Sequence, residues 1–463
     1  MVQVSCSAVS SSGGSYGRKK QAVGGAAHGA NLLGTAFRST VIAAVRQPVR
    51  TMKLGLASLW SRSREIVGSS LPVDLTPQPM PSAAPGTWQF ENLLDAKGFP
   101  RTEMGSLEWL VDGKGFFPEM DRQIAAARHS IDVQVFIFDN DDIAVKYADV
   151  FRKRASELPV RVLYDDLGST FAQGKAPETR GPPGFEPPDD MHDYLRANSK
   201  LAARRTLNPW MTCDHTKLLV FDQRTAIVGG MNIGREYFSE WHDLMVRVEG
   251  PIVQTLAHEF KESWRRAGPL GDFTMGRQPM TRTAVPVAGG IPLRVLRTDL
   301  AEGRHEILDA TLLAIRGARK RIWIQNPYFG NREVALAVES AARRGVDVRV
   351  IIPAAGDSPI MDVGNLITAR DLILAGAKIF RYPRVTHMKV MICDGWASVG
   401  SANLDTLSLR INRELNLAFS DRAEIRELEN KVFFPDFRKS TRVLLSETKT
   451  PAAAVTRVIV GQL

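Results

Sequence analysis

One pattern of chemically active residues occurs twice in the chain. The two copies are His215-x-Lys217-x4-Asp222 and His387-x-Lys389-x4-Asp394. A histidine can attack phosphorus or transfer a proton, and a lysine neutralises negative charge. Each copy therefore suits the binding and activation of a phosphoryl group.

A turn of small residues that ends in asparagine follows each copy. These turns are Gly229-Gly230-Met231-Asn232 and Gly400-Ser401-Ala402-Asn403. Small residues let the backbone approach an anion closely and offer it N–H donors. We therefore predict that Asn232, Asn403 and Ser401 bind the phosphate of a substrate.

Alternation of residue types predicts how the pairs are positioned. Residues 215–221 and 387–393 have the pattern of strands, and a period of two places the histidine and lysine of each copy on one face. Asp394-Gly395 favours a tight turn after the second strand.

Composition describes a globular chain with an affinity for anions. The chain has 463 residues, of which 44% are apolar and 24% charged, and its net charge is +10. This balance favours nucleic acid or an acidic membrane surface as a partner, although a basic solvated face explains the charge equally well. Three cysteines give neither a disulfide framework nor a zinc pattern, and we expect no metal and no cofactor.

The first 88 residues form a basic N-terminal segment. Residues 1–64 contain no Asp or Glu, residues up to about 30 have a disordered composition, and residues 71–88 are a proline-rich linker. No apolar run is long enough for a membrane span. Two interpretations stay open, namely a basic interfacial segment on anionic lipid, and a floppy tail or leader.

The rest of the chain is a duplicated α/β unit. Ala127-Arg128-x-x-Ile131 matches Ala318-Arg319-x-x-Ile322, which predicts a first lobe at 89–275 and a second at 276–463. In the first lobe we predict a helical region at 107–127, a strand at 130–138, a helix at 142–156 and a strand at 160–164. Residues 165–210 are expected to be a long irregular loop, and residues 268–290 a linker.

The duplicated motif resembles that of the phospholipase D superfamily. The resemblance covers roughly residues 95–440 and implies two pseudo-twofold-related lobes, each a mixed sheet flanked by helices, with one active site at their interface. It implies that one histidine attacks phosphorus while the other protonates the leaving oxygen. His215 is the implied nucleophile and His387 the implied acid and base, with Lys217 and Lys389 on the phosphoryl oxygens.

The acidic residues divide into two groups. Asp222 and Asp394 belong to the catalytic motif, but they lie about 15 Å along their strands from the histidines, so we expect structural roles. Asp243 and Glu414 occupy equivalent places in the two repeats, where a carboxylate could orient a histidine, although a position on the rim of the site is also compatible. The equivalent Gln134 and Gln325 either line the pocket or are buried core amides.

The residues around the asparagines resemble bacterial cardiolipin synthases. Gly229–Tyr237 is followed by Trp241-His242-Asp243, and Gly400–Asp405 is followed by Asn412-x-Glu414. This resemblance implies transfer of a phosphatidyl group between phospholipids. Hydrolysis of phospholipids is an alternative, and a nucleic-acid phosphodiesterase or binding protein is another.

The same resemblance sets the expected partners and location. We expect anionic phospholipids and a membrane surface as partners, no nucleic acid, and a monomer that contains an internal pseudo-dimer. The expected location is peripheral, on the cytoplasmic face of a bacterial inner membrane.

Overall fold

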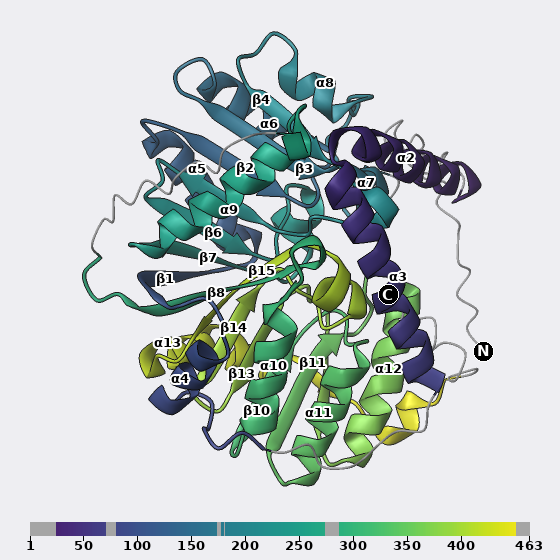
Figure 1. The fold of residues 1–463 in the computed structure, drawn as a ribbon, viewed down its shortest axis with the longest axis vertical. Coiled ribbons are helices and arrows are strands. Elements are labelled where there is room, and N and C mark those ends of the chain that lie inside the picture. Colours follow the sequence, from purple (N-terminus) through teal and green to yellow (C-terminus); the bar gives the residue numbers. More distant parts are fainter. Residues whose placement is uncertain (1–24, 71–79, 174–176, 180, 274–286, 451–463) are drawn as a thin grey trace, which may run out of the picture.

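Two similar halves share one continuous sheet in the computed structural model, which describes residues 25–70, 80–173, 177–179, 181–273 and 287–450 (Figure 1). The strands of the first half are β1 (Glu103–Val111), β2 (Ile131–Val135), β3 (Val160–Asp165), β4 (Ala202–Thr206), β5 (Leu218–Phe221), β6 (Thr225–Gly229) and β7 (Leu244–Glu249). Those of the second are β8 (Ile291–Asp299), β9 (Arg304–His305), β10 (Arg321–Gln325), β11 (Asp347–Pro353), β12 (Lys378–Tyr382), β13 (Val390–Cys393), β14 (Trp396–Gly400), β15 (Glu414–Phe419) and β16 (Thr441–Arg442).

The strand order mirrors itself about the centre of the sheet. It runs β4-β3-β2-β5-β6-β7-β1 in the first half and continues as β8-β15-β14-β13-β10-β11-β12 in the second. Antiparallel pairing of β1 with β8, in which Glu103 faces Leu293, joins the halves. In each half, β2, β3 and β4, or β10, β11 and β12, are parallel and the strands nearer the centre are antiparallel. The short strand β16 adds to the outer edge of the second half, antiparallel to β12. The predicted α/β fold with two pseudo-twofold-related lobes is therefore confirmed.

Helices cover both faces of the sheet. Helix α4 (Trp88–Ala96) precedes β1 in the chain but packs on the second half. The helices of the first half are α5 (Asp112–Ala126), α6 (Asp142–Arg154), α7 (Asp166–Gln173), α8 (Met191–Arg196) and α9 (Ile252–Arg266). In the second they are α10 (Glu306–Gly317), α11 (Arg332–Arg343), α12 (Pro359–Leu374), α13 (Arg422–Leu428) and α14 (Phe434–Lys439). Short 3-10 or π turns are η1 (Pro209–Met211), η2 (Glu236–Glu240), η3 (Gly271–Phe273), η4 (Leu300–Glu302), η5 (Leu407–Ile411), η6 (Glu429–Phe433) and η7 (Leu445–Thr448).

Part of the hydrophobic core is shared by the two lobes. Each lobe has its own core where α5 and α6, or α10 and α11, pack on one face of the sheet. On the other face one cluster extends through both lobes, from Phe260 of α9 to Trp323 and Phe433. Burial of this shared apolar surface stabilises the interface at which the two motif copies meet.

Several elements differ from their predictions. Residues 107–111, predicted as the start of a helix, belong to β1, which pairs with strands on both sides. The strands of the two motif copies begin at Leu218 and Val390, after the histidine and lysine. The predicted irregular loop at 165–210 contains α7, α8, β4 and η1, and β4 extends the sheet beside β3.

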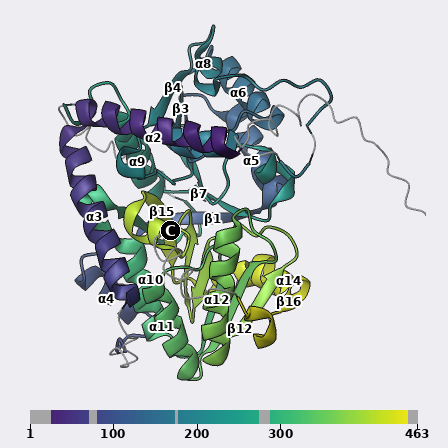
Figure 2. The same cartoon turned by 90° about the vertical axis from the view of Figure 1, so that its right-hand side faces the viewer.

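The N-terminal segment is helical where the structure describes it. Helices α2 (Gly25–Arg46) and α3 (Pro48–Ser70) meet at an angle, with α2 across the first lobe and α3 beside the second (Figure 2). Residues 25–30, which belong to the stretch predicted to be disordered, are helical as the start of α2. The rest of that stretch, half of the proline-rich linker and most of the linker at 268–290 lie outside the described residues. Helix α4, which begins at Trp88, contributes Phe90 and Leu94 to the core of the second lobe. Across the described part of the chain, every helix is too short or too polar to cross a bilayer.

The motif aspartates fix the turns that lead into the central strands. Asp222 accepts hydrogen bonds from the backbone N–H groups of Arg128, His129 and Ser130 at 2.8, 2.6 and 2.9 Å. Asp394 binds the equivalent N–H groups of residues 319–321 at 2.8 to 3.0 Å. Each aspartate therefore ties the end of its hairpin strand to the start of the neighbouring strand.

We expect Asp222→Asn to lower the free energy of unfolding by about 1–3 kcal/mol. An amide has one acceptor oxygen where the carboxylate has two, so part of the three-donor cluster loses its partner. Asparagine also tolerates the positive φ of 52° at this position, so the substitution tests the hydrogen bonds alone. The measurement is the urea-denaturation midpoint. Asp394→Asn is the matched variant in the other lobe, and an unchanged midpoint in both would contradict the role.

Candidate active site at the lobe interface

The two motif histidines lie where the lobes exchange backbone hydrogen bonds. The backbone N–H of His215 donates to the carbonyl of Arg413 at 2.8 Å, and the N–H of His387 donates to the carbonyl of His242 at 2.7 Å. Short parallel bridges, Asp214 with Arg413 and His242 with Thr386, mark the same two junctions. Each histidine is therefore held by the segment of the opposite lobe that carries the equivalent acidic residue.

Each imidazole contacts a carboxylate from the other lobe. Nδ1 of His215 lies 3.0 Å from Oε2 of Glu414, and Nδ1 of His387 lies 2.7 Å from Oδ2 of Asp243. The sequence repeat predicted which acids approach the histidines, and the structure adds that the pairs cross the interface. Because Nδ1 is engaged in both rings, Nε2 is the nitrogen that can carry chemistry.

Each orienting acid contacts a residue of the small-residue turn in its own lobe, and this residue differs between the lobes. A Cβ at Gly230 would lie 2.3 Å from Oδ1 of Asp243, so only glycine leaves room for this carboxylate. The equivalent residue in the second lobe is Ser401, whose hydroxyl donates to Oε2 of Glu414 and accepts from the N–H of Leu415. Ser401 was predicted to bind phosphate, but in this structure its hydroxyl supports Glu414.

The two motif lysines are buried beside the histidines. Nζ of Lys217 donates to the carbonyl of His215 at 2.7 Å, and Nζ of Lys389 donates to the carbonyl of His387. Lys217 is 1% exposed and Lys389 is 2% exposed, so both ammonium groups are removed from water. Two buried cations that each keep donors to spare form an environment suited to an anion.

Burial and mutual repulsion shift the protonation of this cluster. Burial lowers the pKa of Lys389 to about 8, against the attraction of Asp243 and Glu414. Burial and the two lysines also lower the pKa of His215 and hold this ring neutral. The pKa of His387 is lowered by burial and Lys389, while the contact with Asp243 opposes the shift. An anion bound between the lobes would reverse these shifts.

The motif asparagines lie at the ends of the small-residue turns, and both are buried. The side-chain oxygen of Asn232 accepts from the N–H of Ile137 at 2.9 Å. The side-chain nitrogen of Asn232 and the side-chain oxygen of Asn403 have no hydrogen-bond partner within the described residues. A free buried amide N–H of Asn232 is compatible with the phosphate contact that the sequence predicts.

Aromatic rings that the sequence did not reveal pack against both imidazoles. The ring of Phe136 lies 4.6 Å from that of His215, and the rings of Tyr237 and Trp241 lie 5.6 and 5.2 Å from that of His387. These contacts fix the ring planes and exclude water from the far side of each histidine. In the sequence, the one indication of such a contact was the position of Trp241, two residues before the orienting acid Asp243.

The equivalent glutamines differ in their surroundings. Nε2 of Gln325 donates to Oγ1 of Thr386 at 2.7 Å, which places a core amide beside the second motif. Gln134 is 2% exposed, and within the described residues its amide atoms have no hydrogen-bond partner. Carboxylates of Asp139, Asp141 and Glu236 also converge, with oxygens within 4.8 Å of one another. Asp141 caps α6 there, so part of this cluster has a structural role.

A buried cation precedes each orienting acid and contacts a carboxylate of the other lobe. Nδ1 of His242 lies 2.6 Å from Asp112, and its Nε2 lies 2.7 Å from Asp436. In the equivalent place, Arg413 contacts Asp214 at 3.1 Å and Glu259 at 3.0 Å. These pairs fasten the lobes together directly beside Asp243 and Glu414.

We expect His242 to make stability fall as pH rises. Burial lowers the pKa of His242, but its bonds to Asp112 and Asp436 outweigh this and raise the pKa to about 9. Protonated His242 therefore makes its full contribution to the free energy of unfolding below the unfolded pKa of about 6.5. This contribution, roughly 3 kcal/mol, is lost as pH rises through about 9. The measurement is the urea midpoint of wild type and of His242→Gln between these pH values. A constant difference between the two proteins would contradict the charge assignment.

Comparison with known proteins identifies the family of this chain. A family model described as cardiolipin synthase, PLD-like domain, matches residues 120–264 and 312–433, one match in each lobe. A probable cardiolipin synthase of Bacillus subtilis is 31% identical over 349 residues, which are 73% of this chain and 67% of that protein. Cardiolipin synthase A of Pseudomonas entomophila is 30% identical over 73% of this chain and 70% of its own length.

A solved structure supports the fold. The phosphatidylserine synthase of Haemophilus influenzae superimposes with a TM-score of 0.61, covering 81% of this chain and all of that chain, at 12% sequence identity. At this identity the likeness concerns the fold alone. Together with the family match, it confirms the resemblance inferred from the duplicated motif.

Proposed function

This chain belongs to the cardiolipin synthase family with phospholipase D-like domains, and from that premise we propose that it transfers phosphatidyl groups between phospholipids. The observation that carries the proposal is the crossed pairing of His215 with Glu414 and of His387 with Asp243, around two buried lysines. This arrangement offers one phosphorus atom a nucleophile on one side and a proton donor on the other.

In the proposed first step, Nε2 of His215 attacks the phosphorus of a donor phosphatidylglycerol. The bond between phosphorus and the headgroup oxygen breaks, and His387 gives its proton to the departing oxygen, so glycerol leaves. A phosphatidyl group remains on His215. Burial and the two lysines keep His215 neutral and nucleophilic. Burial also lowers the pKa of His387, and the contact with Asp243 opposes this shift and supports the proton that His387 gives and takes.

In the proposed second step, the headgroup hydroxyl of another phosphatidylglycerol takes the place of the departed glycerol. His387 removes the hydroxyl proton as the oxygen attacks phosphorus, and the bond to His215 breaks. The products are cardiolipin and a regenerated His215, and the two steps together convert two phosphatidylglycerols into cardiolipin and glycerol. Lys217, Lys389, Asn232 and Asn403 stabilise charge on the non-bridging oxygens throughout.

The pKa of Lys389 predicts the alkaline limb of the reaction. Burial also lowers the pKa of Lys217 well below its usual value. Since both protonated lysines bind the phosphate anion and the pKa of Lys389 is about 8, kcat/KM should fall as pH rises through about 8. The bound phosphate anion favours the protonated form of Lys389. The alkaline limb of the kcat profile should therefore lie at higher pH than that of the kcat/KM profile. Initial rates in mixed micelles provide both profiles. A kcat/KM profile that stays level to about pH 10 would contradict this role for Lys389.

Product identity distinguishes the proposal from its alternatives. Purified protein is incubated separately with phosphatidylglycerol, phosphatidylcholine and labelled DNA, and the products are resolved. We expect cardiolipin and glycerol in equal amounts from phosphatidylglycerol. Phosphatidic acid as the main product would mean that water is the acceptor, and cleavage of DNA would mean that the substrate is a nucleic acid. Added glycerol should reverse the transfer and lower the yield of cardiolipin.

The proposed substrates place the protein at a membrane. We propose peripheral attachment to anionic phospholipid on the cytoplasmic face of a bacterial inner membrane, by a monomer whose two lobes act as an internal pseudo-dimer. Support comes from the net charge of +10 and from the duplicated family match.

A further inference from the structure

Helices α2 and α3, here called the N-terminal arm, have inverted polarity. The side chains that face the protein are mostly small or polar, namely Thr35, Ala36, Ser39, Ala43, Gln47, Thr51, Leu54, Ser58 and Ser61. The side chains that face away are large and apolar, namely Leu33, Phe37, Val41, Val45, Val49, Met52, Leu56, Leu59 and Trp60. A helix packed on a water-soluble protein has the opposite pattern.

This apolar outer face is continuous along both helices. Its residues recur every three or four positions, and Phe37, Val45 and Trp60 are 74%, 72% and 67% exposed. Contiguous exposed apolar surface of this kind marks an interaction site, whereas single exposed apolar residues do not.

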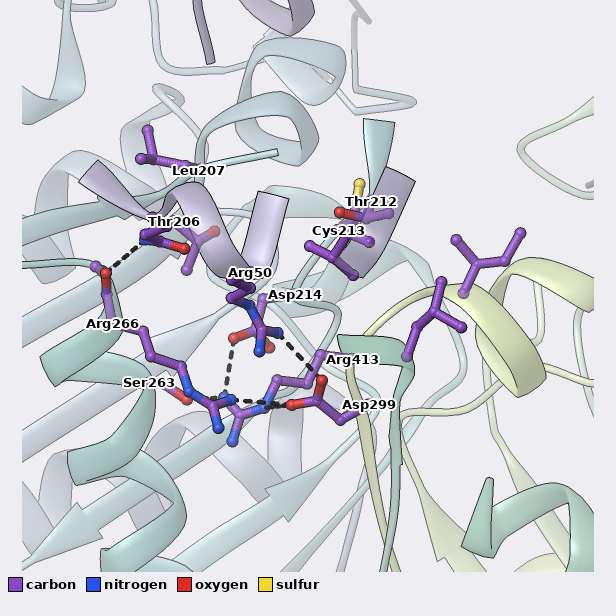
Figure 3. A pocket seen from close by; sticks show the side chains of 15 residues that line it. Arg50, Thr206, Leu207, Thr212, Cys213, Asp214, Ser263, Arg266, Asp299 and Arg413 are labelled. Carbon is purple, nitrogen blue, oxygen red and sulfur yellow. Dashed lines mark hydrogen bonds and ion pairs between the residues drawn. The ribbon is translucent and has the colours of Figure 1, made fainter. Parts of the chain in front are cut away.

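Polar contacts fix the direction in which the outer face points. Nε2 of Gln47 donates to the carbonyl of Arg266 at 2.6 Å, and Arg38 pairs with Asp166 at 3.2 Å. From α3, Arg50 reaches into a polar cavity and contacts Asp299 at 3.2 Å, beside Arg413 (Figure 3). The arm is thus attached to the body through its polar side, which leaves the apolar side unpartnered in the described structure.

The arm also holds the segment that leads to the first motif. The indole N–H of Trp210 donates to the carbonyl of Thr51 at 2.8 Å, and the N–H of Asn208 donates to the hydroxyl of Ser39 at 2.5 Å. Trp210 and Met211 are about half exposed beside the arm, at 51% and 53%, and His215 follows four residues after Met211. Apolar surface therefore continues from the arm to the segment that precedes the active site.

Charge identifies the partner. Residues 25–63 contain no Asp or Glu, whereas Arg38, Arg46 and Lys53 are exposed on the same helices. An apolar face bordered by cations matches the interface of an anionic bilayer, where acyl chains lie next to negative headgroups. Two arms facing each other would bring like charges together, which disfavours a second copy of this chain as the partner.

We propose that the N-terminal arm lies in the surface of an anionic phospholipid bilayer, with its apolar outer face inserted and Trp210 and Met211 beside it. The choice of a lipid surface rests on the proposed function, since the substrates are lipids of that surface. Docking through the arm places the segment before His215 at the depth of the headgroups, so a phospholipid reaches the lobe interface without leaving the membrane.

The test compares vesicle binding of variants that are matched in exposure. Phe37→Ser, Val41→Ser, Leu56→Ser and Trp60→Ser are combined in one full-length protein, and Trp88→Ser, at 71% exposed on α4, is the control for loss of an exposed tryptophan. Flotation with vesicles of phosphatidylglycerol and phosphatidylcholine measures the bound fraction. We expect the combined variant to lose about tenfold or more in partition coefficient, and the control to stay within about twofold of wild type.

A second variant tests whether the cations of the arm contribute to vesicle binding, and a second substrate tests whether all variants are folded. Arg46→Gln with Lys53→Gln should weaken binding to anionic vesicles and reduce its sensitivity to salt. Turnover of a short-chain phosphatidylglycerol dispersed below its micelle concentration should match wild type in all variants, because this substrate needs no membrane.

Two results would overturn the proposal. One is unchanged vesicle binding by the combined variant. The other is a wild-type dimer in solution that the same substitutions convert to monomer, because the outer face would then bind a second copy. Failure of the proposed function has a different signature, namely arm-dependent vesicle binding by a protein that produces no cardiolipin.

Discussion

His387→Ala should lower turnover of phosphatidylglycerol by about a hundredfold to ten-thousandfold, and His215→Ala should abolish it. The two losses have different causes. Without His215 no bond to phosphorus forms, whereas without His387 the headgroup oxygen must leave unprotonated. A substrate whose leaving group needs no proton separates the two roles.

The discriminating substrate is a p-nitrophenyl phosphodiester with an acyl-glycerol on the other side. Because p-nitrophenolate leaves without protonation, His387→Ala should release it in a burst equal to the enzyme concentration and then stall with a phosphatidyl group on His215. Mass spectrometry of the acid-sensitive adduct identifies the modified residue, with His215→Ala as the control that shows no burst. A burst in His215→Ala with an adduct on His387 would reverse the two assignments.

The features that repeat along the chain could be predicted from sequence. The recurrence of Ile131 at Ile322 and of the two motifs predicted paired lobes, and the mirrored strand order confirms them. The spacing from each motif to Asp243 and Glu414 predicted that these acids approach histidines. A twofold repeat, however, gives the same spacing whether an acid serves its own lobe or the other, so only the structure reveals the crossed pairing.

Other elements were missed because their local pattern conflicts with their surroundings. Residues 107–111 continue the apolar periodicity of α5, but β7 and β8 provide partners on both edges and make them a strand. The N-terminal arm is helical, yet its apolar residues face away from the core, so its amphipathic pattern gave no indication of which side packs. Tertiary context decided both cases.

Glu414→Gln and Asp243→Asn should each lower kcat by about a hundredfold to ten-thousandfold while the protein stays folded. An amide cannot support the imidazolium that His387 becomes, and it can impose the wrong tautomer on His215. Burial raises the pKa of Glu414 to about 8, against the attraction of Lys217. This folded-state pKa exceeds the ordinary value of 4.5. Ionisation of the buried carboxyl group therefore lowers the free energy of unfolding as pH rises from 4.5 through about 8.

The crossed geometry makes the second prediction specific to the pair of lobes. Above about pH 8, the urea-denaturation midpoint of Glu414→Gln should therefore be no lower than that of wild type, although the variant is nearly inactive. Because Glu414 serves His215, its loss should slow the burst with the p-nitrophenyl substrate. Loss of Asp243, which serves His387, should leave the burst and slow only the turnover that follows. Equal effects of the two substitutions on the burst would contradict the division of labour across the interface.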